Sequence, residues 1–122
     1  MRSIFLTASF LFISLALFGQ KKWSAYIFVA EECPISIYMT QPLQKVANQF
    51  DEQVEFIMVF PRKNSTQERA QAFLAQHEIP QFSIHLDPDQ QLTKKLEATI
   101  TPEVVIVENE TESVLYRGRI SD

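Results

Sequence analysis

Apolar runs of strand-forming residues alternate along the chain with stretches in which apolar side chains recur every three or four positions. Residues 25–30 and 54–60 are largely apolar, which is typical of strands buried on both faces. Residues 82–86 alternate apolar and polar side chains, which predicts a short strand. Two further strand-like segments cover residues 104–107 and 114–119.

Helical spacing fills the gaps between the first four strands. Pro34 is favoured as the first residue of a helix, and Pro42 inside the same stretch predicts a kink. Its apolar stripe is formed by Leu43, Val46, Ala47 and Phe50. Residues 65–68 form a capping box that opens a second helix. The third helix is expected to be capped by Asp87, with Pro88 as its first residue.

The connections predict the topology. Residues 108–113 are polar and too few for a helix, so the last two strands should form an antiparallel hairpin. The earlier strands are separated by helices, and right-handed crossovers place such helices on both sheet faces. The predicted fold class is therefore α/β, with a central mixed sheet in the order βαβαβαββ.

The N-terminal 19 residues have the pattern of a signal peptide rather than of folded structure. Arg2 supplies a positive start, and residues 4–18 form an apolar run that is short for the ~20 residues of a membrane span. We expect cleavage near Gly19, export to the periplasm or the exterior, and no stable membrane insertion afterwards. An uncleaved membrane anchor is the alternative. The remaining domain is predicted to cover residues 24–122.

Composition excludes several functions. The net charge is −4 and no long basic cluster occurs, so nucleic acid is not an expected partner. His77, His85 and a single cysteine are too few for a metal site, which needs three or four converging ligands. We expect neither a metal nor another cofactor.

The single cysteine, Cys33, stands where the first strand meets the first helix. If Pro34 begins the helix, Cys33 is its N-cap, and the helix N–H groups favour the thiolate. Glu31 and Glu32 oppose ionisation through like charge, so we expect a modestly lowered pKa. The alternative is an inert, packed cysteine.

The motif Cys-Pro-Ile-Ser at residues 33–36, followed much later by Thr101-Pro102 before a strand, resembles the thioredoxin-like superfamily. Within it, the chain is most similar to redoxins of the alkyl hydroperoxide reductase and thiol-specific antioxidant group. The similarity extends over residues 24–122. It includes Leu86-Asp87-Pro88-Asp89, Thr101-Pro102-Glu103-Val104 and Tyr116-Arg117-Gly118-Arg119-Ile120.

This resemblance implies roles for individual residues. Cys33 matches the attacking cysteine, and Pro34 follows it in the motif. Pro102 matches the cis-proline beside the active-site turn, where the backbone of Thr101 would meet a partner peptide. Ser36 stands where relatives carry a second cysteine. Without that second thiol, a protein partner or small thiol reductant must resolve any mixed disulfide.

The chain departs from the peroxidase pattern of the family. Ala30 stands where peroxiredoxins carry Thr or Ser, and Tyr26 where they carry Pro. Arg117 or Arg119 could supply positive charge near the thiolate. The sequence ends where the family usually adds a C-terminal helix, so either one sheet face is less covered or the sequence is a fragment.

These observations predict an extracytoplasmic thiol oxidoreductase or antioxidant that acts through Cys33 on disulfides or peroxides. Ser36 and Pro102 would support the chemistry, and Pro34 and Thr101 would contact the partner. The alternative is a non-catalytic thioredoxin-like module that binds a peptide or partner protein.

Overall fold

The computed structural model describes residues 20–120, so the predicted signal peptide lies outside the described residues. The helices and strands follow one another in this order: β1 (Trp23–Phe28), α1 (Pro34–Tyr38), α2 (Thr40–Phe50), β2 (Val54–Phe60), α3 (Gln67–Gln76), β3 (Ser83–Leu86), α4 (Gln91–Lys95), β4 (Glu103–Glu108) and β5 (Val114–Gly118).

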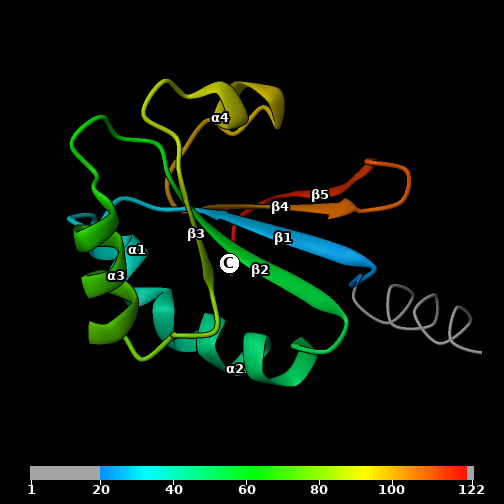
Figure 1. Cartoon of the computed structure of the whole chain (residues 1–122), viewed down its shortest axis with the longest axis horizontal. Coiled ribbons are helices and arrows are strands. Elements are labelled where there is room, and N and C mark those ends of the chain that lie inside the picture. The colour runs from blue at the N-terminus through cyan, green and yellow to red at the C-terminus, as the bar shows by residue number, and fades with distance from the viewer. Residues whose placement is uncertain (1–19, 121–122) are drawn as a thin grey trace, which may run out of the picture.

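The five strands form one mixed sheet in the order β3-β2-β1-β4-β5 (Figure 1). β1 pairs in parallel with β2, and β2 with β3. β4 lies antiparallel to β1 and forms the predicted hairpin with β5. Ile27 lies between Met58 of β2 and Val104 of β4. The predicted fold class and mixed sheet are confirmed.

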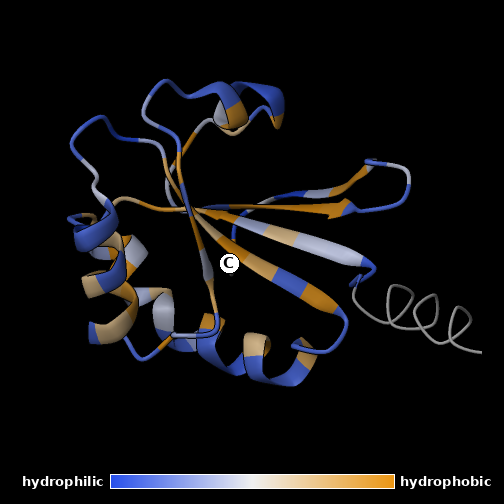
Figure 2. Ribbon diagram, in the orientation of Figure 1, coloured by the Kyte–Doolittle hydropathy of each residue, from blue (hydrophilic) through white to orange (hydrophobic). Residues whose placement is uncertain are grey.

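Helices cover both faces of this sheet. Figure 1 shows α4 on the side opposite α1, α2 and α3. The larger core packs Leu43 and Ala47 of α2 and Phe73 of α3 against Ile27 and Met58. The smaller core lies on the other face, where Leu92 of α4 packs against the cluster. The buried members of the cluster are Phe28, Val59, Leu96, Val105 and Val107. Burying each large apolar side chain contributes about 1.5–3 kcal/mol, and Figure 2 shows this apolar character along β2 and β4.

The first predicted helix is divided at Met39 into α1 and α2. Pro42 has no N–H to donate to the carbonyl of Tyr38, and its ring crowds the same carbonyl. The helical hydrogen bonds nevertheless continue from Met39 N to Ile35 O and from Leu43 N to Met39 O. The interruption is therefore confined to Met39, three residues before Pro42, with helical hydrogen bonds on both sides of it.

Two predicted helix starts are wrong. Thr66, rather than Ser65, caps α3 by accepting the N–H of Arg69 at 3.2 Å, because Ser65 lies in a turn closed onto Arg62. Helix α4 begins at Gln91 rather than at Pro88.

A turn explains the later start of α4. The N–H of Gln90 bonds to the Asp87 carbonyl at 3.0 Å, and Asp followed by Pro favours such a turn. The Asp87 carboxylate still caps the helix, by accepting the N–H groups of Leu92 and Thr93. Within residues 20–120, no helix is long and apolar enough to cross a membrane.

Candidate active site

Cys33 lies in the loop after β1 and is the N-cap of α1, as predicted. Its φ of −78° and ψ of 117° are those of extended backbone. Its N–H bonds to the Ala30 carbonyl at 3.0 Å, and its own carbonyl accepts the N–H of Ile37 at 3.0 Å. Pro34 begins the helix, where its missing N–H costs nothing. The thiol is partly exposed and forms no disulfide.

The loop before β4 lies directly against Cys33. β4 pairs antiparallel with β1, with Glu103 opposite Phe28, so the residues before β4 meet those after β1. The peptide bond between Thr101 and Pro102 is cis. The Cys33 thiol faces the carbonyl oxygen of Thr101 across 4.0 Å. The fold thus brings Cys33, Thr101 and Pro102 together, although 68 positions separate the first two.

Glu103 holds this loop in place and was missed by sequence reasoning. Its buried carboxylate accepts the N–H of Thr99 at 2.9 Å and of Ile100 at 3.0 Å. Charge-assisted bonds of this kind are stronger than those between neutral groups. The signal in the sequence was an acidic residue at the start of an otherwise apolar strand, directly after Thr-Pro.

Ser36 is fully buried beneath the cysteine loop. Its Oγ accepts the N–H of Ala30 at 3.4 Å, which links the end of β1 to α1. Ser36 lies three residues after Cys33, on the same side of the helix. The structure therefore brings together Cys33, Ser36, Thr101 and Pro102, with Pro34 at the helix start.

The surroundings of Cys33 lower the pKa of its thiol. The backbone N–H of Ser36 contributes most; partial burial opposes it, and the Ser36 hydroxyl, the Ile35 N–H and the charge of Arg62 add to the lowering. The sulfur accepts no capping hydrogen bond of ordinary geometry. The helix groups therefore act on it as nearby dipoles, and the sulfur remains available to a reactant.

Four side chains beside Cys33 form an ion-pair cluster: Glu31, Glu32, Arg62 and Arg69. Arg69 lies 2.9 Å from Glu32 and 3.8 Å from Glu31, and Arg62 lies 3.8 Å from Glu32. The positive charges of the arginines offset the negative charges of the two carboxylates, which were expected to oppose ionisation of the thiol. Arg62 and Arg69 come from the loop after β2 and from α3, so their proximity could not be read from the sequence.

The two arginines considered from the sequence lie in different places. Arg117 donates to the Leu96 carbonyl at 2.8 Å and lies 3.4 Å from Glu97, which ties β5 to the end of α4. Arg119 lines a hollow that also includes Thr101 and Pro102.

We call this hollow the cis-proline groove. It has a volume of about 410 Å³. Its lining residues are Ile35, Tyr38, Met39, Ile100, Thr101, Pro102, Arg119 and Ile120. Tyr38 is 74% exposed, Ile35 57% and Ile100 48%. Exposed large apolar side chains gathered around a hollow are typical of a surface that binds a partner.

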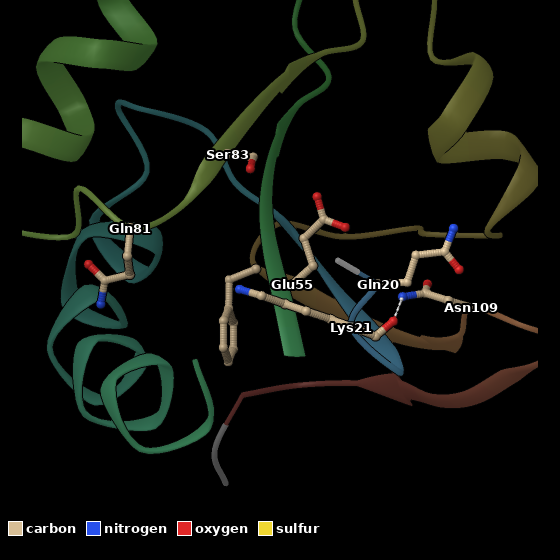
Figure 3. A pocket seen from close by; sticks show the side chains of 7 residues that line it. Gln20, Lys21, Glu55, Gln81, Ser83 and Asn109 are labelled. Carbon is tan, nitrogen blue, oxygen red and sulfur yellow. Dashed lines mark hydrogen bonds between the residues drawn. The ribbon is translucent and has the colours of Figure 1, made fainter. Parts of the chain in front are cut away.

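A second hollow lies at the other end of the strands, beside the starts of β1, β2 and β3. It has a volume of about 460 Å³, and Figure 3 shows its lining, which includes Lys21, Glu55 and Gln81. Glu55 and Gln81 point away from each other, and the Asn109 amide is engaged by the Lys21 carbonyl at 2.8 Å. Lys21 precedes β1, whereas Cys33 follows it, so this hollow is remote from the thiol.

Neither histidine lies in a cluster of ligands. His77 packs its ring on Phe73, with centroids 4.6 Å apart, and His85 is exposed on β3. No group of three or more His, Cys, Asp or Glu side chains in residues 20–120 could hold a metal ion.

The fold is thioredoxin-like. A thioredoxin-like protein from Aeropyrum pernix superposes with a TM-score of 0.73 at 19% identity, over 84% of this chain and 71% of that one. A hypothetical protein from Sinorhizobium meliloti gives 0.75 at 21% identity, over 88% of this chain and 61% of that one. A secreted Mycobacterium tuberculosis disulfide oxidoreductase homologous to Escherichia coli DsbE gives 0.64 at 19% identity, over 81% and 69%.

The search of family models and the search of curated proteins gave no match. The likeness to solved structures therefore establishes the fold, and one of those structures is the secreted disulfide oxidoreductase named above.

Proposed function

We propose that this chain is an exported thiol oxidoreductase of the redoxin type that acts through Cys33 alone. One observation carries the proposal: a partly exposed thiol with a lowered pKa stands at the start of α1 and faces Thr101 and cis-Pro102. A thiolate, rather than a thiol, is the nucleophile in disulfide exchange. The groove beside it offers room for the polypeptide that carries the target sulfur.

The proposed reaction is thiol–disulfide exchange in two steps. The Cys33 thiolate attacks one sulfur of a partner disulfide; a bond forms between them, the old sulfur–sulfur bond breaks, and the departing thiolate takes a proton from water. An external thiol then attacks the partner sulfur of the mixed disulfide, which releases Cys33 and leaves the partner bonded to the external thiol. A second external thiol attacks this new disulfide, frees the partner's second thiol and forms the disulfide of the reductant, so two electrons pass from the reductant to the partner.

Disulfides are a better-supported target than peroxides. Ala30, which replaces the hydroxyl residue of the peroxidases, is buried and offers no side-chain donor to a peroxide oxygen. With a peroxide, Cys33 would become a sulfenic acid as the oxygen–oxygen bond breaks. One external thiol would then form a mixed disulfide with Cys33 and release water, and a second would free the Cys33 thiol and form the disulfide of the reductant. Arg62 is the positive charge that acts on this sulfur.

The rates at which Cys33 reacts with a disulfide and with a peroxide test this proposal. The reaction of Cys33 with a neutral 2-pyridyl disulfide and with hydrogen peroxide is measured at neutral pH, with the urea-unfolded chain as the matched control. We expect the folded chain to react faster than the unfolded chain with the disulfide. Equal or slower reaction of the folded chain would reject the oxidoreductase function.

A binding module is the second candidate. It is favoured by the buried Ser36 in place of a second thiol and by the exposed Tyr38, Ile35 and Ile100 around the cis-proline groove. Such a module would hold a peptide without exchange. An inert Cys33, together with peptide binding that survives Cys33→Ala, would favour this candidate.

Export is part of the proposal and rests on the N-terminal sequence pattern. The secreted oxidoreductase among the similar structures supports the same compartment. Intact mass of the native protein tests it: we expect loss of Met1 to Gly19, and a mass that retains these residues would reject cleavage.

A further inference from the structure

We propose that Arg119 makes the cis-proline groove selective for partner segments that carry an acidic side chain close to the reacting sulfur. This inference rests on the proposed function and specifies its partner: an extended polypeptide with an apolar residue for the groove and a carboxylate for Arg119.

The first step is the position of Arg119. It follows β5 and lines the same hollow as Pro102, whose neighbour Thr101 lies 4.0 Å from the Cys33 sulfur. The Arg119 carbonyl accepts the Tyr116 hydroxyl at 2.7 Å, which fixes the backbone where the arginine leaves the strand. A peptide attached to Cys33 through a disulfide and lying along this groove would pass Arg119 within a few residues.

The second step is the charge balance around the thiol. Arg62 and Arg69 are paired with Glu31 and Glu32, and Arg117 with Glu97. Among residues 20–120, the Arg119 guanidinium has no ion pair and donates no hydrogen bond, and no acidic residue lines the groove. An exposed arginine that has no partner among the described residues fits a carboxylate in two-pronged geometry.

The third step is the apolar wall. Tyr38, Ile35 and Ile100 present exposed apolar surface beside the arginine, so the groove combines an apolar contact with one positive charge. A basic segment would meet repulsion from Arg119, and this repulsion adds to the discrimination.

The experiment uses three short peptides whose single cysteine is activated as a neutral 2-pyridyl disulfide. They are identical except for Glu, Gln or Lys beside the cysteine. The release of pyridinethione by the full chain gives the rate of mixed-disulfide formation for each. We expect the Glu peptide to react about two- to fivefold faster than the Gln peptide at low ionic strength. This ratio of rates corresponds to the free energy that an exposed ion pair contributes. The Lys peptide should be slowest, and salt should reduce the differences.

Arg119→Ala should remove the preference, and Arg119→Lys should keep part of it. Lys94→Ala is the matched control: it removes the same charge from α4, on the other sheet face, and should leave the preference unchanged. Equal rates for the Glu and Gln peptides with wild type, or a preference that survives Arg119→Ala, would overturn the inference while leaving the oxidoreductase function intact. No reaction with any peptide would reject both.

A second copy of this chain is the competing occupant of the groove. Sedimentation of wild type and Arg119→Ala distinguishes it. We expect both to sediment alike; a wild-type dimer that dissociates on Arg119→Ala would contradict a peptide partner.

Discussion

Cys33 and Asp87 occupy equivalent places in the fold and differ in how completely their hydrogen bonds are made. Each follows a parallel strand, β1 or β3, and each precedes a helix of five residues, α1 or α4. Asp87 is buried, and its carboxylate accepts the N–H groups of Leu92 and Thr93 and the Thr93 hydroxyl. Cys33 is partly exposed and receives no cap bond of ordinary geometry.

The difference separates a carboxylate that holds a helix start from the thiol that we propose to react. Burial alone would raise the pKa of Asp87, but the three hydrogen bonds and the nearby His85 together lower it. Those bonds stabilise the charge and hold the carboxylate against the start of α4. At Cys33 the same kind of helix start lowers the pKa of the thiol, while the sulfur stays accessible.

The largest expected change is a gain of activity from Ser36→Cys. A second thiol one turn after Cys33 can close an internal disulfide and release a bound partner without external thiol. Reduction of a protein disulfide such as that of insulin, with a dithiol reductant, should rise from background to clear turnover. Ser36→Ala is the matched control and should stay at background; no gain from Ser36→Cys would contradict the proposed geometry.

The next largest expected effect is a loss of stability when Asp87 is replaced. Asp87→Ala leaves the N–H groups of Leu92 and Thr93 without their carboxylate and should lower the free energy of unfolding by about 2–3 kcal/mol. Urea unfolding measures it. Asp89→Ala, an exposed neighbour, should change stability by less than about 0.5 kcal/mol. Equal losses at the two positions would remove the contrast with Cys33.

Acid should weaken the stabilisation that the Asp87 carboxylate contributes. Because the folded pKa of Asp87 is lowered, its stabilisation is full above the ordinary Asp pKa of ~3.9 and is lost as pH falls through the lower folded value. The stability difference between wild type and Asp87→Asn should therefore shrink below about pH 4. A difference that stays constant from neutral pH to pH ~2 would show that ionisation of Asp87 is not involved.

A smaller effect is expected from Arg62, the charge that sequence reasoning missed. Arg62→Gln should raise the pKa of the Cys33 thiol, but by less than Ser36→Ala, since the Ser36 hydroxyl lowers that pKa more than the Arg62 charge does. The pH dependence of iodoacetamide alkylation gives both values. Lys63→Gln, next along the same loop, is the matched control; an Arg62 effect larger than that of Ser36 would reverse the assigned order of causes.

The sheet and the cysteine position were predictable because they depend on local pattern. Apolar runs predicted β1 and β2, and Pro34 marked the start of α1 with Cys33 at its cap. The starts of α3 and α4 were misplaced because turns closed by Ser65 and Gln90 compete with the helix at those positions.

The charges around the thiol were predicted least well because they depend on packing between distant segments. Glu31 and Glu32 were visible beside Cys33, but their partners Arg62 and Arg69 belong to another loop and another helix. Arg117 and Arg119 are two residues apart in the chain, yet one reaches the end of α4 and the other lines the cis-proline groove.

The most direct test of the central claim is the rate of Cys33 alkylation as a function of pH in the native chain. Cys33 is the only thiol, so the measurement needs no variant. The contrast with Asp87 requires an ionisable sulfur stabilised by α1 yet open to a reagent. We expect rapid alkylation with an apparent pKa below the ~8.5 of a free thiol. An apparent pKa at or above ~8.5 would contradict the proposed function.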